Sequence, residues 1–256
     1  MVKTSVFFYL EGERLFSGLE ANLKEEDFRH AYRVLRLREQ AALIVSDGTG
    51  LVYRARIISA TPKSITVRLD QKLNNPKQKL QVVLLQSITK GDKMDTIVRQ
   101  SVELGVARIV PVISKRTVPV RDKSQEVKRM QRWKNIIRSA AAQSRRPYLP
   151  AIDDPMELFA IIDQIKGKEV IIPWEEEKHF SLNERLSQPC PDDGAVYLLI
   201  GPEGGFDLAE VETIEKVGPK TVHLGPRILR TETAAIAALT IIQSAWGDLS
   251  SEGAYF

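Results

Sequence analysis

The chain has 256 residues, of which 43% are hydrophobic and 27% charged, so it can fold as one large domain or two smaller ones. It has no apolar run near the roughly 20 residues of a membrane helix, and its single cysteine, Cys190, excludes an internal disulfide, so we expect a cytoplasmic protein. The net charge of +4 is uneven: residues 71–150 carry 18 Lys and Arg against 5 Asp and Glu, whereas residues 151–256 carry 8 against 19.

The first part of the chain combines short β-prone runs with turn signals. A strong turn signal stands at Asp47-Gly48-Thr49-Gly50, and one helix is expected over 24–37. The strands expected here are 5–10, 43–45, 51–58 and 64–69. Short strands separated by turns predict a small barrel over residues 1–72, and the polar stretch at 74–77 indicates a domain boundary.

From residue 73 onward, apolar strand candidates alternate with segments of helical period. The expected strands are 80–87, 108–113, 170–174, 195–200 and 221–224. The expected helices are 93–104, one around 125–143, 155–165, one opening at Asp207, and 231–246. Continuous apolar strands interleaved with helices predict an α/β fold with a parallel sheet buried on both faces.

A glycine-rich loop, Gly201-Pro202-Glu203-Gly204-Gly205, follows the strand at 195–200. Because ligands bind beyond the carboxyl ends of strands in open parallel sheets, this loop is a candidate ligand site. It has neither the phosphate-loop nor the dinucleotide signature. Glu203 would repel a phosphate and suits a cationic part of a cofactor. A tight strand-to-helix turn that needs glycine explains the loop equally well.

A second loop runs from Leu224 through two arginines into an alanine-rich helix. Thr231 could be a simple N-cap. Arg230 is expected among apolar neighbours, where an unpaired charge is costly, so we expect it to have a function.

The basic block supplies a third candidate site. Lys128, Arg132 and Arg138 share one side of the helix at 125–143, opposite Val127, Met130, Ile137 and Ala141. Such a row can neutralise phosphates, although a solvated helix face would also explain it. The three histidines lack metal-ligand spacing, so no metal site is expected. Cys190 is expected to be a structural or incidental thiol.

The two loops together resemble the ribosomal RNA small subunit methyltransferase E family of the SPOUT superfamily. The resemblance rests on residues 201–205 and 224–234, and on matches at His30 with 34–36, at 103–106, at 114–116 and at 143–145. It implies a PUA-like RNA-binding barrel over 1–72 and a SPOUT methyltransferase domain with a C-terminal trefoil knot over 73–256. It further implies a homodimer that uses S-adenosylmethionine to methylate N3 of a uridine in small-subunit (16S) ribosomal RNA, a step of ribosome biogenesis.

The resemblance also implies roles for individual residues. As catalytic residues it implies Arg230, which would steady negative charge on the uracil, and Glu232, which would orient Arg230 or help the proton leave. As cofactor-binding residues it implies Leu199, Ile200, Gly201, Pro202, Glu203, Gly204, Gly205, Leu224, Gly225, Ile228, Leu229, Arg230, Thr231, Thr233 and Ala234. The residues expected to bind RNA are Arg36, Lys90, Lys115, Arg116, Arg132, Arg145 and Arg146.

Two alternative functions stay open. A non-catalytic RNA-binding or ribosome-assembly protein could keep the same fold, although a damaged cofactor loop would then be expected. A methyltransferase of the same superfamily could also act on another RNA position.

Overall fold

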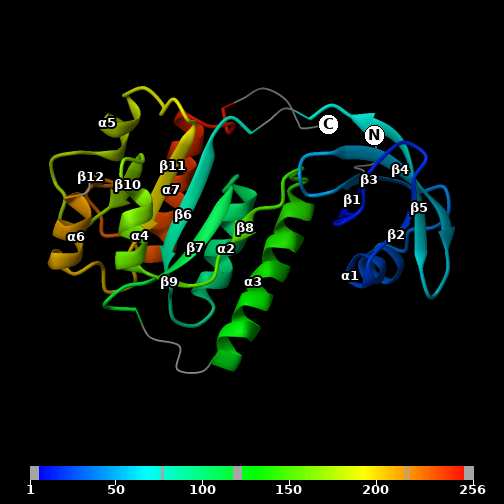
Figure 1. Ribbon diagram of the computed structural model, residues 1–256, viewed down its shortest axis with the longest axis horizontal. Coiled ribbons are helices and arrows are strands. Elements are labelled where there is room, and N and C mark those ends of the chain that lie inside the picture. Colours follow the sequence, from blue (N-terminus) through cyan, green and yellow to red (C-terminus); the bar gives the residue numbers. More distant parts are fainter. Residues whose placement is uncertain (1–5, 76–77, 118–122, 217, 219, 251–256) are drawn as a thin grey trace. The chain divides into compact units, whose positions relative to one another are not determined.

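The structure is a computed structural model that describes residues 6–75, 78–117, 123–216, 218 and 220–250 (Figure 1). These residues form two compact units. The first unit contains residues 6–75 and 141–149, and the second contains the rest of the described chain. The exact domain boundary expected at residues 72 and 73 stays a prediction.

The first unit is built on a five-stranded sheet with the order β1-β3-β4-β5-β2. β1 runs parallel to β3, and the other neighbouring pairs are antiparallel. One apolar cluster, which includes Phe8, Leu43 and Ile57, fills its core. Closure of this sheet into a barrel stays a prediction. The strands are β1 (Val6–Tyr9), β2 (Glu20–Asn22), β3 (Ala42–Ser46), β4 (Val52–Ala60) and β5 (Ile65–Leu73).

The helix expected over 24–37 is shorter and changes type. An α-helix, α1 (Glu25–Arg29), continues as one turn of π-helix at His30–Val34, where the Leu35 N–H donates to the His30 carbonyl. The chain then leaves the helix at Arg36, which has a φ of +52°. The side chain of Arg36 is exposed.

Residues 141–149 complete the first unit. The Tyr9 hydroxyl donates to the carbonyl of Arg146 at 2.6 Å, and the Ser46 hydroxyl donates to the carbonyl of Pro147 at 2.9 Å. Arg146 is consequently only 6% exposed. This segment is held against β1 and β3, and the expected role of Arg146 in RNA binding stays a prediction. Arg145 is half-buried.

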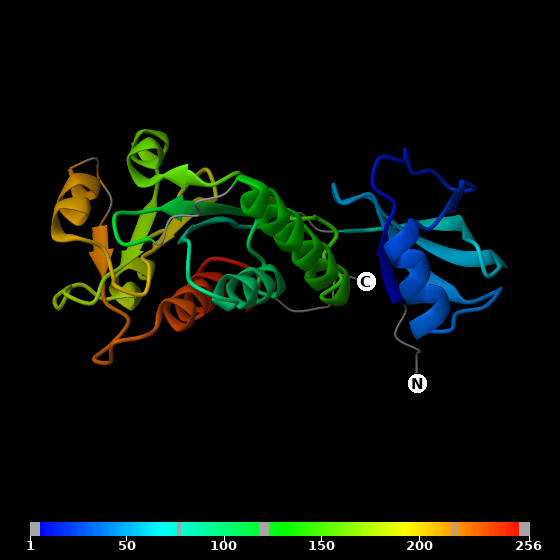
Figure 2. The same cartoon turned by 90° about the horizontal axis from the view of Figure 1, so that it is seen from below.

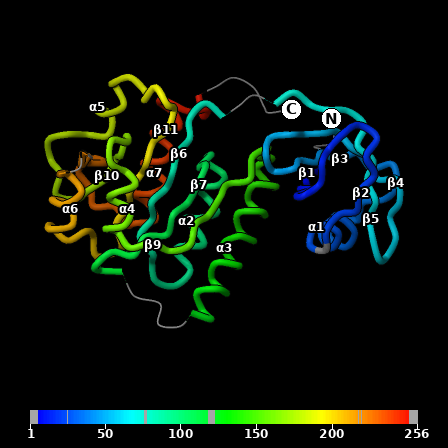
Figure 3. Tube along the Cα trace, viewed as in Figure 1, coloured from blue at the N-terminus to red at the C-terminus, as the bar shows by residue number. Residues whose placement is uncertain are grey.

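The second unit contains a fully parallel sheet, which confirms the α/β prediction. The strand order is β12-β10-β11-β6-β7-β8, with β9 also paired to β7, so the chain crosses over between β6 and β11 and between β10 and β12, which are neighbours in the sheet but not in sequence (Figure 3). The strands are β6 (Gln81–Ser87), β7 (Arg108–Ile113), β8 (Ala151–Ile152), β9 (Met156–Glu157), β10 (Val170–Pro173), β11 (Ala195–Ile200) and β12 (Lys220–Val222).

Helices cover both faces of this sheet (Figure 2). α4 and α6 pack on one face in an apolar cluster with Val83, Leu85 and Leu199, whereas α2 and α7 pack together on the other. The short helix α5 was not expected, although Ser181 and Glu184 form its capping box. The helices are α2 (Lys93–Glu103), α3 (Lys123–Gln143), α4 (Leu158–Ile165), α5 (Leu182–Leu186), α6 (Leu208–Glu215) and α7 (Thr231–Ala245). No helix among the described residues is long and apolar enough to cross a membrane.

A buried carboxylate connects α3 to α2. The indole N–H of Trp133, a residue only 1% exposed, donates to Asp95 Oδ1 at 3.2 Å, and Arg132 forms an ion pair with Asp95 Oδ2. The apolar side of α3 begins at Met130, because Val127 is 70% exposed and does not lie on the buried side as expected. Arg132, which was expected to bind RNA, is partly neutralised by this ion pair.

Substitution of Asp95 tests this connection. Asp95→Ala leaves the buried Trp133 N–H without its acceptor, which should cost about 1–3 kcal/mol and lower the melting temperature by several degrees in thermal unfolding. Asp95→Asn keeps an oxygen acceptor and should lose much less. An Asp95→Ala variant as stable as the wild type would show that this hydrogen bond contributes nothing.

Candidate functional site

Three neighbouring strands end at one edge of the second unit's sheet. β12, β10 and β11 are adjacent and parallel, so the segments that follow them lie along the same edge. These segments are residues 174–177 after β10, 201–207 after β11 and 223–230 after β12. This edge is where open parallel sheets bind ligands.

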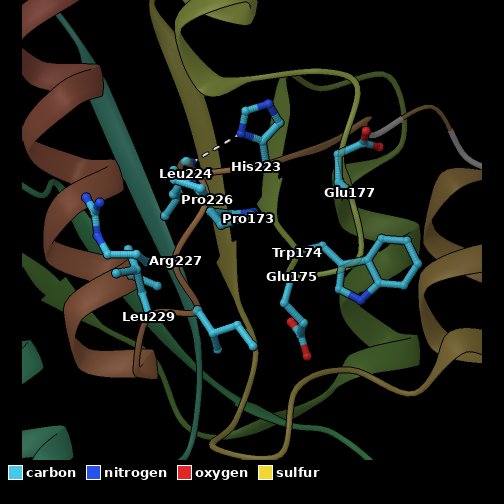
Figure 4. Close-up of a pocket in the computed structure, with 12 residues that line it drawn as sticks. Pro173, Trp174, Glu175, Glu177, His223, Leu224, Pro226, Arg227 and Leu229 are labelled. Carbon is cyan, nitrogen blue, oxygen red and sulfur yellow. Dashed lines mark hydrogen bonds between the residues drawn. The ribbon is translucent and has the colours of Figure 1, made fainter.

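A pocket lies between the segments after β10 and β12 (Figure 4). It contains about 500 Å³ of space, part of it open to solvent. Trp174, Glu175 and Glu177 form one side of its lining, and the 224–229 loop forms the other. Its lining residues are Pro173, Trp174, Glu175, Glu177, His223, Leu224, Gly225, Pro226, Arg227, Ile228, Leu229 and Ala234.

The two carboxylates of the pocket differ in their bonding. Glu177 accepts hydrogen bonds from the backbone N–H groups of His179 and Phe180 at 2.7 and 3.1 Å, and from the Thr221 hydroxyl at 3.0 Å. These bonds, the one from His179 above all, hold the pKa of Glu177 below its usual value. Glu175 makes no hydrogen bond or ion pair with any residue that the structure describes. Glu177 is therefore fixed, whereas Glu175 is free to bind a ligand.

The glycine-rich loop after β11 requires glycine at its last position. Gly205 has a φ of +68°, and a Cβ there would lie 2.2 Å from Glu175 Oε1. At Gly201, a Cβ would lie 3.3 Å from the ring of Phe206, which folds back over the loop. The loop is thus a tight turn with its last glycine directly against the free carboxylate of the pocket.

Glu203, which was expected to suit a cationic part of a cofactor, has partners within the protein. Its Oε1 accepts from the Lys90 backbone N–H at 3.0 Å and from Lys93 Nζ at 3.3 Å. Burial acts to raise its pKa, but hydrogen bonds from its own N–H, the Lys90 N–H and Lys93 outweigh this and hold the pKa below its usual value. Glu203 is not among the residues that line the pocket, and its carboxylate serves to hold the loop against the start of α2.

Two residues expected to bind RNA also contact the glycine-rich loop and the start of α6. Arg116 donates to the carbonyl of Gly204 at 2.5 Å, and Lys115 Nζ lies 3.0 Å from Asp207 Oδ2. The Lys115 hydrogen bond is the main cause that lowers the pKa of Asp207. Asp207 caps α6 in the predicted capping box with Glu210. Lys115 and Arg116 remain exposed, so these contacts do not exclude RNA, but they give both residues a role in holding the glycine-rich loop.

Arg230 is exposed, contrary to the expectation that it lies among apolar neighbours. It is the N-cap residue of α7, in an extended conformation, and its guanidinium has no ion pair with any residue in the described part of the chain. Thr231 is consequently the first helical residue and not the N-cap. Its hydroxyl donates to the carbonyl of Gly201 at 2.6 Å and accepts from Gln86 Nε2 at 3.2 Å, which joins the two loops. Glu232 is half-buried and has Lys93 as its ionic partner, at 3.9 Å.

The pocket brings together only part of the expected cofactor-binding set. Leu224, Gly225, Ile228, Leu229 and Ala234 line it, whereas Leu199 and Ile200 are buried in β11. Residues 201–205 approach it through Gly205. Thr233 is exposed on the first turn of α7, and Lys90 is exposed before α2.

The pocket wall after β10 was not predicted from the sequence. Its residues Trp174, Glu175 and Glu177 directly follow a buried strand, which was a usable signal, but nothing in the sequence placed that strand beside β11 and β12. His223, whose Nδ1 accepts from the Gly225 N–H at 3.2 Å, was not predicted as a site residue either. Among the described residues, no group of three His, Cys, Asp or Glu could hold a metal ion. Burial raises the pKa of the Cys190 thiol, which disfavours the thiolate.

Comparisons with known proteins identify the family of the chain. Residues 76–243 match the family described as RNA methyltransferase domain, and residues 23–70 match the RNA methyltransferase PUA domain. Ribosomal RNA small subunit methyltransferase E from Buchnera aphidicola is 34% identical over 85% of this chain and 87% of its own length. The protein of the same name from Bacillus subtilis is 27% identical over 92% of this chain and 94% of its own.

Two solved structures are similar to the whole chain. Ribosomal RNA small subunit methyltransferase E from Neisseria gonorrhoeae, bound to S-adenosyl methionine, has a TM-score of 0.86 at 32% identity and covers 96% of this chain and 99% of its own. A Legionella pneumophila protein described as a methyltransferase, in complex with the cofactor SAM, has a TM-score of 0.84 at 34% identity. It covers 96% of this chain and 100% of its own.

Substitutions of neighbouring glycines test the loop. Gly205→Ala should destabilise the protein by about 1–3 kcal/mol, because alanine is strained at positive φ, and it should displace the flexible end of Glu175. Gly204→Ala is the matched control, since its Cβ would lie 3.4 Å from Arg116 Cδ, an ordinary contact. Thermal unfolding measures both variants. Equal melting temperatures for the two would show that the backbone at Gly205 is not constrained.

Proposed function

The chain belongs to the ribosomal RNA small subunit methyltransferase E family and is an RNA methyltransferase, and we propose that it transfers a methyl group from S-adenosylmethionine to N3 of a uridine in small-subunit (16S) ribosomal RNA. The observation that carries this proposal is the pocket between the segments that follow β10 and β12. It lies at the edge of the sheet where residues 201–205 and 224–234 meet. Two similar structures hold the same cofactor.

The residues of the pocket fit S-adenosylmethionine. This cofactor combines a flat adenine with two cationic groups, a sulfonium and an ammonium. Trp174, Leu224 and Leu229 provide apolar surface for the adenine, and Glu175 provides a carboxylate with no partner among the described residues. The lining carries two carboxylates, Glu175 and Glu177, against one guanidinium, that of Arg227. The excess of negative charge favours a cation over a phosphate.

Bound S-adenosylmethionine supplies an electrophilic methyl group on its sulfonium. The protein's task is then to align the uracil with that group, which is where most of the rate acceleration in a displacement arises. Arg230 is exposed directly after the lining loop, so its guanidinium can donate to a uracil oxygen as N3 loses its proton. Glu232, two residues further on, would accept that proton.

Basic residues outside the pocket would bind the RNA backbone. Arg36 in the first unit and Lys90 in the second are exposed, and residues 23–70 match a PUA domain of RNA methyltransferases. The same proposal includes Lys115, Arg116, Arg132 and Arg145. The first three also make the contacts within the protein that are described above. Phosphate contacts of this kind supply affinity and orientation but little sequence information.

The family also implies a trefoil knot and a homodimer, and we infer both for this chain. The knot would involve the 201–205 and 224–234 segments, which the Thr231 hydrogen bond to Gly201 holds together. Knots are rare in proteins, and a knotted cofactor loop would explain why two distant glycine-rich segments have to meet at one edge of the sheet.

A methyl-transfer assay tests the proposed reaction. Purified protein, labelled S-adenosylmethionine and small ribosomal subunits from cells that lack the endogenous activity should give labelled RNA, with N3-methyluridine identified by mass spectrometry. Naked ribosomal RNA is run in parallel. Cofactor binding without label on either substrate would point to another RNA target, and no cofactor binding would favour a non-catalytic RNA-binding protein.

The catalytic role of Arg230 is tested separately. Arg230→Ala should lower kcat by about 100- to 1,000-fold, the usual loss when one charge-stabilising donor is removed. Its affinity for S-adenosylmethionine, measured by calorimetry, should change little, because the guanidinium does not line the pocket. Arg99→Ala, which removes an exposed arginine from α2, is the control. Unchanged turnover in Arg230→Ala would remove Arg230 from the mechanism.

A further inference from the structure

Lys93 contacts both segments on which the family resemblance rests, 201–205 and 224–234. It is the first residue of α2, and its Nζ lies 3.3 Å from Glu203 Oε1 in the loop after β11 and 3.9 Å from Glu232 Oε2 in the first turn of α7. Neither the motifs nor the expected site residues included it. It carries the only positive charge that pairs with either glutamate among the described residues.

The ion pair with Glu232 lies in an unusual setting. Glu232 Oε2 is fully buried and has no hydrogen-bond partner in the described part of the chain, although its side chain as a whole is 23% exposed. A buried carboxylate oxygen without a donor is costly. At 3.9 Å, Lys93 offsets this cost by charge alone, without a hydrogen bond that would fully occupy the carboxylate.

The two contacts of Lys93 differ in kind. Glu203 Oε1 accepts hydrogen bonds from both Lys93 and the Lys90 N–H, so this carboxylate is fixed. Glu232 receives only the weaker ionic contact, so it is oriented but keeps its capacity to accept a proton. An ammonium has three donors, so Lys93 can serve both carboxylates.

We propose that Lys93 is a positioning residue of the methyl transfer, which anchors on Glu203 and holds the Glu232 carboxylate in place to accept the proton from uracil N3. The inference rests on the proposed function, because it concerns the route of that proton. Removal of N3–H leaves an anion that takes the methyl group, and the proton passes to Glu232 and then to solvent. Lys93 itself neither touches the substrate nor changes its protonation.

The first experiment distinguishes a role of Lys93 in positioning Glu232 from a role only in holding the glycine-rich loop. Lys93→Met should lower kcat at saturating substrates by about 10- to 100-fold, the loss expected when a reacting group is misplaced. The Kd for S-adenosylmethionine, measured by calorimetry without RNA, should change by less than about threefold. Lys93→Arg keeps the charge and should restore most of kcat. Arg99→Met removes an exposed charge from the same helix and should behave as the wild type.

A second measurement does not depend on activity. Lys93→Met, Glu232→Gln and the double variant are compared in thermal unfolding without ligand. If the two side chains interact, their effects on melting temperature should not be additive, as expected for residues in contact. Additive effects would overturn the pairing on which the proposal is built.

The remaining outcomes are also decisive. A weakened cofactor Kd with an unchanged kcat at saturation would show that Lys93 only braces the glycine-rich loop. Failure of Lys93→Arg to restore kcat would show that charge at this position is not what matters. If the wild-type protein methylates no RNA, the proposed function fails. The comparison of the single and double variants in thermal unfolding still reports whether Lys93 and Glu232 interact.

Discussion

The site depends on one buried hydroxyl. Thr231 donates to the carbonyl of Gly201 and accepts from Gln86, so a single side chain joins the end of β6, the loop after β11 and the start of α7. Thr231 is 6% exposed, and a lost partner there would leave buried polar groups unsatisfied. The Thr231 bond to Gly201 fixes where α7 begins. That position in turn places Arg230 outside the helix and Glu232 on the turn that faces Lys93.

The uneven charge along the chain has two physical consequences. Part of the basic block pairs with acidic residues of the C-terminal part: Lys93 with Glu203 and Glu232, and Lys115 with Asp207. Exposed pairs of this kind contribute little to stability individually. Their effect here is positional, because each holds a segment that follows β11 or begins α7. The unpaired positive charge of the basic block is therefore smaller than its sequence count.

Local patterns predicted the elements of the second unit well but not their neighbours. The apolar run at β11 and the Asp207–Glu210 capping box identify a strand, a loop and a helix from local signals alone. The pocket wall at Trp174 and Glu175 was missed because the order β12-β10-β11 depends on contacts between distant segments. Arg230 was expected to be buried because its sequence neighbours are apolar. The helix begins one residue later, so its side chain leaves the core. The π-helical turn at His30–Val34 carries no local signal that distinguishes it from an α-helix.

The four carboxylates in and around the pocket divide into two that are fixed by hydrogen bonds and two that are not. Glu177 and Glu203 accept several hydrogen bonds and are fixed before any ligand arrives. Glu175 and Glu232 have capacity left, one in the pocket and one at the start of α7. A fixed framework with a few unsatisfied groups lowers the cost of ordering the site on binding. Because only interactions stronger in the transition state increase turnover, in the proposed reaction Glu175 would govern the affinity for the cofactor, whereas Glu232 would govern the rate.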